Sequence, residues 1–294
     1  MSWLFMNNHE EVIGMYWKGR RQSNNVEDRR GTATKGVIGG GIGTIIVILL
    51  FALLGGNPSD ILEQIQIPNS EYASNYQETE EEKELAEFVA VVLAETEDVW
   101  TTIFRQNGKE YSLPRLVLYS GYVNSACGIA GASTGPFYCP GDYRVYIDLS
   151  FFNELQHRFK APGDFAMAYV IAHEIGHHIQ NQLGISDEVM SYRNRLSQKE
   201  FNQLMVRLEL QADYLAGVWA HYVNRMDLLD EHDVQEALNA ASAVGDDRIQ
   251  KSTQGYVVPD SFTHGTSEQR QKWFYKGFKS GNLKDGDTFN TDLL

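Results

Sequence analysis

The sequence predicts an α+β fold that is mainly α-helical, with a small sheet and one transmembrane helix ahead of it. Three observations predict this fold class. Residues 36–54 form a run of 19 residues without a charged side chain. After residue 80, apolar side chains recur every three or four positions in several long stretches, which is typical of helices. Residues 144–149 alternate between polar and apolar side chains, which is typical of a strand.

The composition limits the partners and the metal chemistry. The chain has 294 residues and a formal net charge of −14. This acidic balance argues against nucleic acid as a partner, because phosphate binding needs a basic face. The two cysteines, Cys127 and Cys139, belong to no C-x-x-C pair, which excludes a zinc site built from four cysteines.

Residues 1–35 are expected to form a mobile cytoplasmic tail without a packed core. We hypothesise that the protein starts at Met6 or Met15 rather than at Met1. The basic side chains of this tail lie toward the uncharged run that follows: Lys18, Arg20, Arg21, Arg29, Arg30 and Lys35.

The uncharged run at 36–54 is predicted to cross a membrane once. As a helix it spans roughly 28 Å, about the thickness of one hydrocarbon core. A buried core helix and a cleaved signal peptide are the alternatives. The run is longer than the usual core of a signal peptide, however, and Leu53-Leu54-Gly55-Gly56 is not an A-x-A cleavage site. Basic residues precede the run and acidic residues follow it, so the N-terminus is expected in the cytoplasm and the chain after residue 55 in the periplasm or the extracellular space.

Two further expectations depend on this anchor. In an oxidising compartment, Cys127 and Cys139 are expected to form a disulfide across a loop rich in Gly, Ala and Ser, with two unpaired thiols as the alternative. The Gly-x-x-x-Gly spacings at 36–40 and 39–43 offer a face for a homodimer, although a glycine-rich run produces this pattern easily.

The chain after the anchor is expected to consist of a linker at 55–79 and one domain at 80–294. The linker is rich in Gly, Asn, Pro and Ser and has no sustained period. Within the domain, the patterns predict helices over about 80–104, 165–183, 199–226, 233–244 and 267–278. They predict strands over 116–119 and 144–149, and a long loop over 246–266.

The stretch Ala172-His173-Glu174-Ile175-Gly176-His177-His178 contains the pattern H-E-x-x-H within a predicted helix. Because His173 and His177 lie one turn apart on the same face, both imidazoles can reach one Zn²⁺ ion at about 2.0–2.1 Å. Glu174 is placed to take a proton from a zinc-activated water. His178 is rotated by about 100° from His177 and is expected to face away.

A catalytic zinc site needs a third protein ligand and an open position for water. The candidates are Glu209, Asp213, His157, His178, His221, His232 and His264. Glu209 and Asp213 lie four residues apart among apolar and small neighbours, so we expect them on one buried helical face. Because a buried carboxylate without a partner is costly, Glu209 is expected to be the third ligand and Asp213 to accept a hydrogen bond from a zinc-bound histidine. An exposed carboxylate pair is the alternative.

HEIGHH followed about thirty residues later by ELQAD resembles the gluzincin pattern, in which two His and one Glu bind zinc. More narrowly, the chain resembles the YpfJ-like neutral zinc metallopeptidases over about residues 15–280. Further matching stretches are KGRRQSNNVEDRRG from Lys18, FYCPGD from Phe137 and THGTSEQR from Thr263. The resemblance implies a zincin-like metallopeptidase domain that holds Zn²⁺ through His173, His177 and Glu209, with Glu174 as general base and Asp213 behind the ligands.

The resemblance also implies a role for His264. In related families a T-H-P-S…R segment follows the zinc site, and Thr263-His264-Gly265-Thr266…Arg270 is similar to it. His264 or Arg270 is therefore expected to bind the oxyanion or to orient a partner, although Gly265 replaces the proline. A histidine in a surface loop is the alternative.

The expected function is that of a membrane-anchored zinc-dependent metallopeptidase acting on a peptide or protein. An extended substrate is expected beside residues 144–149, taken as an edge strand. One alternative is a membrane-tethered, zinc-containing binding or assembly protein without peptidase activity, in which Glu174 would have no purpose. Another is a zinc hydrolase of non-peptide amides.

Overall fold

A small sheet and a larger group of helices make up residues 14–31, 76–131 and 134–291, which the computed structural model describes. Among these residues the main sheet has four strands in the order β1-β2-β6-β5. β1, β2 and β6 run parallel to one another, and β5 runs antiparallel to β6. The bounds of the strands are Val26–Asp28 for β1, Arg115–Tyr119 for β2, Phe137–Cys139 for β5 and Arg144–Asp148 for β6.

The strand order corrects one expectation about substrate placement. β6 pairs with β2 on one side and with β5 on the other, so it is an inner strand and the expectation of an edge strand at 144–149 is wrong. β5 lies at the edge of the sheet instead. A separate hairpin precedes it, made of β3 (Tyr122–Ser125) and β4 (Gly128–Gly131). A disulfide joins Cys127 to Cys139, with the two Cα atoms 5.8 Å apart, and so fastens the turn of this hairpin to β5.

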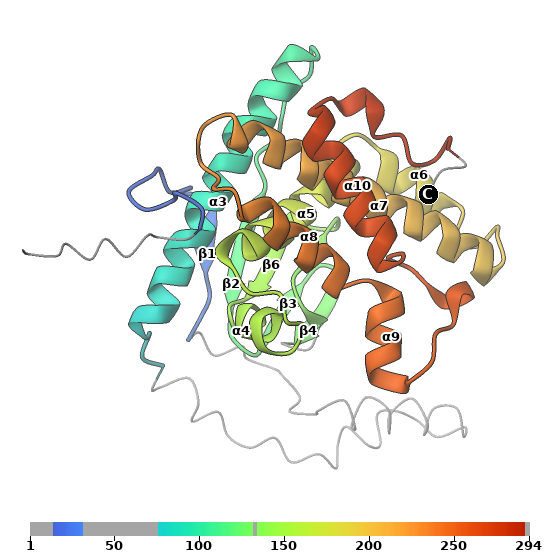
Figure 1. Cartoon of the computed structure of the whole chain (residues 1–294), viewed down its shortest axis with the longest axis horizontal. Helices are drawn as coiled ribbons and strands as arrows, with labels where there is room; N and C mark the ends of the chain where they lie inside the picture. Colours follow the sequence, from blue (N-terminus) through green and yellow to red (C-terminus); the bar gives the residue numbers. More distant parts are fainter. Residues whose placement is uncertain (1–13, 32–75, 132–133, 292–294) are drawn as a thin grey trace, which may run out of the picture.

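The helices account for most of the described chain. They are α3 (Glu80–Gln106), α4 (Ser150–His157), α5 (Asp164–Gln182), α6 (Ile185–Ser191), α7 (Gln198–Asn224), α8 (Asp233–Ala243), α9 (Asp246–Gln254) and α10 (Ser267–Ser280), with short 3-10 turns at Pro259–Ser261 and Leu283–Asp285. Figure 1 shows β1 and β2 beside α3, whereas α7 and α10 lie on the opposite side of the molecule. Residues 246–254 form the helix α9, so the prediction of a continuous loop over 246–266 is wrong for this part.

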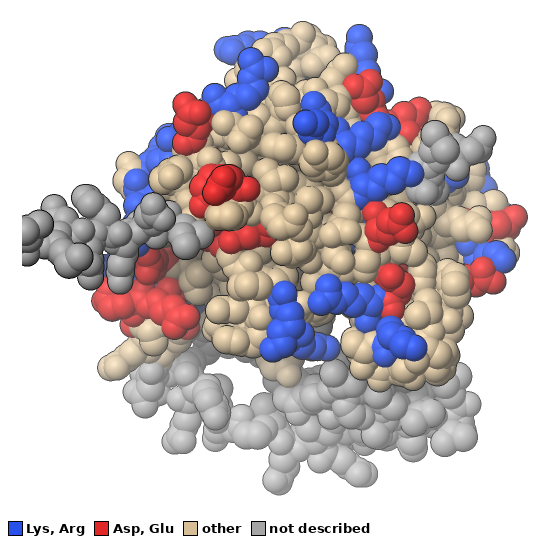
Figure 2. Space-filling view, in the orientation of Figure 1, with Lys and Arg blue, Asp and Glu red and all other residues tan. Residues whose placement is uncertain are grey.

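The long helix α3 begins where its sequence provides a cap. The side chain of Thr79 accepts a hydrogen bond from the amide of Glu82, and the Glu82 side chain accepts one from the amide of Thr79. The first turn is acidic, with Glu80 and Glu81 beside Glu82, and Figure 2 shows acidic side chains gathered at this end of the helix. Negative charge there is favourable, because it faces the positive end of the helix dipole.

Three glycines allow the helices of the core to approach closely. A Cβ atom on Gly176 of α5 would lie only 2.9 Å from the carbonyl oxygen of Ala212 in α7. Gly217 of α7 and Gly277 of α10 likewise contact the backbone of the facing helix, with no room for a side chain. The α5–α7 and α7–α10 contacts place the H-E-x-x-H helix, the ELQAD helix and Arg270 around one point.

The N-terminal segment differs from the expected tail. Residues 26–28 form β1, which pairs in parallel with residues 116–118 of β2. Met15 is 1% exposed and belongs to the main hydrophobic core. Arg20 pairs with Glu95 of α3 at 2.7 Å, and further polar contacts join this segment to α3. Residues 14–31 are therefore part of the folded domain.

The predicted membrane anchor needs correction. The run at 36–54, with its glycine spacings for a homodimer, lies outside the described residues. In the part of the chain that the structure describes, no helix is both long enough and apolar enough to span a bilayer. The predicted topology also places residues 1–35 and 80–294 on opposite sides of a membrane, whereas β1 and β2 come from these two parts and form one sheet. The described fold is mainly helical α+β, and the predictions of a transmembrane helix and a single-pass membrane localisation are not supported.

Candidate metal centre

The helix α5 carries both histidines of the H-E-x-x-H motif on its inner face. His173 and His177 lie one turn apart, with their ring centroids 4.8 Å apart. His173 and Glu174 are buried, and His177 is partly buried. α5 is apolar around nearly its whole circumference here, because it packs against α3, α7 and α8.

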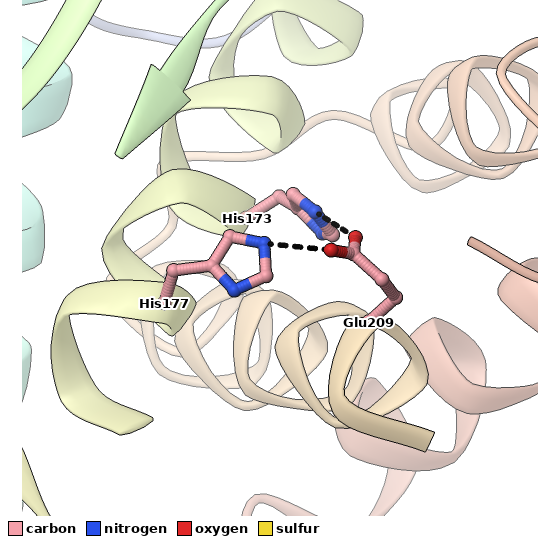
Figure 3. Close-up of side chains that lie close together, drawn as sticks. All are labelled: His173, His177 and Glu209. Carbon is pink, nitrogen blue, oxygen red and sulfur yellow. Dashed lines mark hydrogen bonds and ion pairs between the residues drawn. The ribbon is translucent and has the colours of Figure 1, made fainter. Parts of the chain in front are cut away.

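Glu209 of α7 faces these two histidines, as Figure 3 shows. Its Oε2 atom lies 3.2 Å from Nε2 of His173, and its Oε1 atom lies 3.5 Å from Nε2 of His177. The ligand atoms of the three residues lie within 4.8 Å of one another. The three side chains predicted from the sequence to bind a metal, His173, His177 and Glu209, thus converge on one point.

A second layer of contacts fixes the orientation of each imidazole. Nδ1 of His173 lies 2.9 Å from Oδ1 of Asp213, and Nδ1 of His177 lies 2.9 Å from Oε1 of Gln180. Both partners are acceptors, so each Nδ1 is placed to donate a hydrogen bond and each Nε2 is the nitrogen left to bind a metal. Both Nε2 atoms face the carboxylate of Glu209, as the arrangement of metal-binding imidazoles requires.

Asp213 is the centre of a buried network. Its Oδ2 atom accepts a hydrogen bond from Nε of Arg270 at 2.8 Å, and its Oδ1 atom accepts bonds from Nη2 of Arg270 at 3.0 Å and from the hydroxyl of Tyr169 at 2.5 Å. Arg270 also donates to the carbonyl of Val244 at 3.2 Å. This network holds Asp213 in place and keeps it charged while it accepts the hydrogen bond from His173.

The charges of the site favour a cation between the imidazoles and the carboxylates. Burial lowers the pKa of His173, but the carboxylates of Asp213 and Glu209 outweigh it and raise this pKa to about 9. Burial raises the pKa of Asp213, but Arg270 and His173 outweigh it and lower this pKa to about 2. Burial likewise raises the pKa of Glu209, but His177 and His264 hold it well below its usual range. Both carboxylates are therefore ionised at neutral pH.

A cavity of about 600 Å³ opens onto this cluster. Glu174 and His264 both line it. Asp246 holds the loop that carries His264, because its Oδ2 atom accepts the backbone amides of Thr263, His264 and Gly265. The His264 side chain is half exposed, and the carboxylate of Glu209 raises its pKa.

The other histidines considered as ligands lie elsewhere. His178 points away from the cluster, with Nε2 at 2.7 Å from the carbonyl of Ser112, and burial lowers its pKa. His221 interacts with the carbonyl of Phe278. The metal-binding group found among the described residues at this place consists of His173, His177 and Glu209, and it includes neither His157 nor His232.

Sequence reasoning did not identify two residues of the second layer. Gln180 is fully buried, and its amide nitrogen donates to the carbonyl of Leu208 at 2.7 Å, which turns its oxygen toward His177. Tyr169 lies one turn before His173. The signal for both was their spacing: Tyr169 is four residues before His173 and Gln180 is three after His177, so each shares the face of the histidine it supports.

The donor set fits zinc. Two imidazole nitrogens and one carboxylate oxygen are the ligands of a catalytic zinc site with one position open. Each of the two histidines is oriented by a buried partner, and the open side faces the cavity. His173, His177 and Glu209 are thus the residues that could hold the metal, and no residue among them would have to turn around to do so.

Comparison with known proteins agrees with this geometry. Residues 15–289 match the family model described as "Putative neutral zinc metallopeptidase". The chain is 45% identical to YpfJ of Escherichia coli (strain K12) over 95% of its own length and 100% of that protein. It is 36% identical to Mb2605 of Mycobacterium bovis and to Rv2575 of Mycobacterium tuberculosis, over 81% of its own length and 84% of theirs. No solved structure matches the chain. The chain belongs to the neutral zinc metallopeptidase family.

Proposed function

We propose that this protein hydrolyses peptide bonds at the cluster of His173, His177 and Glu209, with zinc as its cofactor. The observation that carries the proposal is the orientation of the two imidazoles. Each donates its Nδ1 proton to a buried acceptor and directs Nε2 toward Glu209. A buried site whose imidazoles are oriented in this way, and whose open side faces a cavity, suits a catalytic metal. A structural metal site would be closed on all sides.

Each side chain of the cavity has a distinct part in the reaction. When bound, zinc supplies a water of lowered pKa and polarises the scissile carbonyl. Glu174 lines the cavity directly beside His173 in sequence, so it takes the proton of the attacking water and passes it to the leaving amine. His264 lines the same cavity from the loop before α10. Its imidazole donates a hydrogen bond to the carbonyl oxygen of the substrate as negative charge develops on that oxygen.

Arg270 acts through Asp213 rather than on the substrate. Both oxygens of Asp213 accept hydrogen bonds from the Arg270 guanidinium, which is itself buried. The pair keeps Asp213 charged and aimed at His173, which raises the basicity of the imidazole. Arg270 is therefore a positioning residue.

The edge strand β5 gives the cavity a peptide-binding wall. Phe137 and Tyr138 of β5 line the cavity, and so do the aromatic side chains of Phe151 and Phe159. β5 pairs with β6 on one side, and within the described residues no strand pairs with its other side, where an extended peptide backbone could add. We propose that a peptide lies along β5, with apolar side chains favoured where the phenylalanines line the cavity.

The deciding experiment measures metal content and peptide cleavage on the full chain, because residues 14–31 belong to the fold. The purified protein is expected to hold one zinc per chain and to cleave a mixture of unstructured peptides, and a chelator should abolish the cleavage. Glu174→Gln should retain zinc and lose activity by a factor of 10² or more. Glu268→Gln, an exposed substitution in the first turn of α10, is the matched control and should cleave normally.

The same measurement separates the proposal from its alternatives. A binding or assembly protein would hold zinc without cleaving peptides, and Glu174→Gln would leave its binding unchanged. A hydrolase of other amides would need Glu174 but would cleave small amide substrates rather than peptides. Zinc retention with no peptide cleavage by the unaltered chain would therefore contradict the proposed function.

A further inference from the structure

A second cluster of acidic side chains lies at the start of the H-E-x-x-H helix. It joins Asp164, the first residue of α5, to Asp233 and Glu236 in the first turn of α8. Oxygen atoms of these three carboxylates lie within 4.8 Å of one another. The cluster is separate from the zinc-ligand candidates, and the proposed peptidase activity gives it no role.

Backbone amides hold one oxygen of each carboxylate. Oδ1 of Asp164 accepts the amide of Met15 at 3.1 Å, and Oε2 of Glu236 accepts the amide of Phe165 at 3.1 Å. Oδ2 of Asp233 accepts the amide of Asp230 at 2.8 Å. Three segments far apart in sequence thus meet here: the N-terminal segment, the start of α5 and the start of α8.

The remaining oxygen of Asp233 provides an independent indication of a ligand. Asp233 is 0% exposed, and its Oδ1 atom has no hydrogen-bond partner among the described residues. A buried carboxylate oxygen without a partner costs free energy, and a bound cation would satisfy it. The nearby Asp230 accepts the amides of Gly14, His232 and Asp233, so it adds negative charge and offers no donor to this oxygen.

The charges of the cluster are not balanced within the described part of the chain, where no ion pair involves Asp164, Asp233 or Glu236. Burial and the neighbouring carboxylates raise the pKa of Asp233 to about 7 and that of Glu236 to about 7. Burial also raises the pKa of Asp164. Ionised carboxylates so close together repel one another unless a cation lies between them.

Glycines leave room for the carboxylates to converge. A Cβ atom on Gly14 would lie 2.8 Å from Oδ2 of Asp164, and one on Gly163 would overlap the carboxylate of Glu236. A side chain at either position would collide with a carboxylate of the cluster, so both glycines are needed for the observed arrangement.

We propose that Asp164, Asp233 and Glu236 bind a hard divalent cation, Ca²⁺, that ties the N-terminal segment and α8 to the start of α5. All three groups offer oxygen, which Ca²⁺ and Mg²⁺ prefer over the nitrogen ligands of the zinc site. Ca²⁺ is held by several protein carboxylates in a flexible geometry, whereas Mg²⁺ keeps most of its waters and is usually bound by one or two carboxylates. Three carboxylates that converge on one point therefore favour Ca²⁺.

The test uses the full chain, stripped of metal with a chelator and reloaded with one equivalent of Zn²⁺. Ca²⁺ is then titrated while binding is followed by equilibrium dialysis and stability by thermal unfolding. We expect one Ca²⁺ per chain, and a rise in Tm of about 5 °C at a concentration 100 times the Kd. Mg²⁺ should give a smaller rise at the same concentration.

Two variants separate this site from other effects of Ca²⁺. The double substitution Asp233→Asn and Glu236→Gln should abolish both the binding and the rise in Tm, while its Tm without Ca²⁺ stays equal to or above that of the unaltered chain, since repulsion is relieved. Glu81→Gln, in the exposed first turn of α3, should leave the rise unchanged. His177→Ala, which disables the zinc site, should also leave Ca²⁺ binding unchanged, so the result does not depend on peptidase activity.

Two outcomes would overturn the proposal. One is the absence of Ca²⁺ binding by the unaltered chain up to about 10 mM, which exceeds the Kd of weak extracellular calcium sites. The other is a Ca²⁺-dependent rise in Tm of equal size in the Asp233→Asn and Glu236→Gln double variant. The titration of the unaltered chain is decisive even where that variant fails to fold.

Discussion

Nδ1 of His173 lies 2.9 Å from Oδ1 of Asp213, and the same carboxylate accepts two hydrogen bonds from Arg270. A metal ligand, its acceptor and a buried cation thus form one chain of contacts across α5, α7 and α10. Asp213 is 0% exposed, so neither charge is screened by solvent. The orientation of His173 therefore depends on a residue from the C-terminal part of the sequence.

Asp213→Asn should weaken zinc binding by about 10–100-fold, because a neutral amide is a poorer acceptor for the Nδ1 proton and makes the imidazole less basic. Zinc affinity is measured by competition with a chelating dye. Asp187→Asn, an exposed change in the first turn of α6, is the control. An unchanged affinity in Asp213→Asn would show that His173 does not depend on this contact.

The same variant should also lose stability, since the buried Arg270 is left without its carboxylate. Removing one partner of a buried ion pair typically costs about 3–5 kcal/mol. Adding Arg270→Gln should recover part of this free energy of unfolding without restoring zinc affinity. That separation distinguishes a role in orienting the ligand from a role in stability alone.

Removing the disulfide should destabilise the sheet edge that faces the cavity. Cys127 and Cys139 are 12 residues apart in sequence, and a loop of about that length contributes about 3 kcal/mol by limiting the unfolded chain. The double change to alanine should lower the free energy of urea unfolding by about this amount. If peptides lie along β5, their KM should rise more than kcat falls.

Reduction of the unaltered chain provides the control for that prediction. A reducing agent should shift its urea midpoint toward that of the double variant and leave the midpoint of the variant unchanged. Equal unfolding free energies for oxidised and reduced protein would contradict the stabilising role of this bond.

Helices with strong local signals were predictable from the sequence. The predicted helices at 165–183 and 199–226 lie close to α5 and α7, because apolar spacing and end signals agree along both. The helical spacing also places His173 and His177 on one face of α5, whereas their approach to Glu209 depends on the packing of α5 against α7. Their ligand roles stay a prediction, as does that of Glu174 as general base.

Elements that depend on distant partners were not predictable. β1 has only three residues in a polar, charged segment, and its pairing with β2 spans about 90 residues of sequence, so no local pattern indicates it. α9 has no buried residues and therefore lacks the apolar stripe on which a helix prediction rests. The acidic cluster at Asp164 is likewise assembled from three separate segments.

The N-terminal segment should be required for folding. A chain of residues 80–294 lacks β1 and the partners of Glu95 and Glu97, and it exposes the edge of β2. We expect it to aggregate or to unfold at a clearly lower temperature than the full chain. A synthetic peptide of residues 14–31 added in trans should restore part of the stability, and a fragment as stable as the full chain would contradict this prediction.

The pH dependence of stability follows from the acidic cluster. In the folded protein without Ca²⁺, the pKa values of Asp233 and Glu236 are raised to about 7, against about 4 in the unfolded chain. Between these values the folded state binds more protons than the unfolded state, so stability falls as pH rises from about 4 to about 7 and levels off above that. The Ca²⁺-free, zinc-loaded protein should therefore be more stable at pH 5 than at pH 8.

Urea unfolding at pH 5, 6, 7 and 8 measures this dependence, and the comparison with Asp233→Asn plus Glu236→Gln isolates the two groups. Asp213, whose pKa is lowered to about 2, changes stability only below this range, so it does not interfere. The double variant should lose the fall in stability between pH 5 and 7. Saturating Ca²⁺ should flatten the same part of the curve in the unaltered chain, because a bound cation keeps both carboxylates ionised in the folded state. If stability depended on pH in the same way in the unaltered chain and in the double variant, these two carboxylates would not be the cause of that dependence.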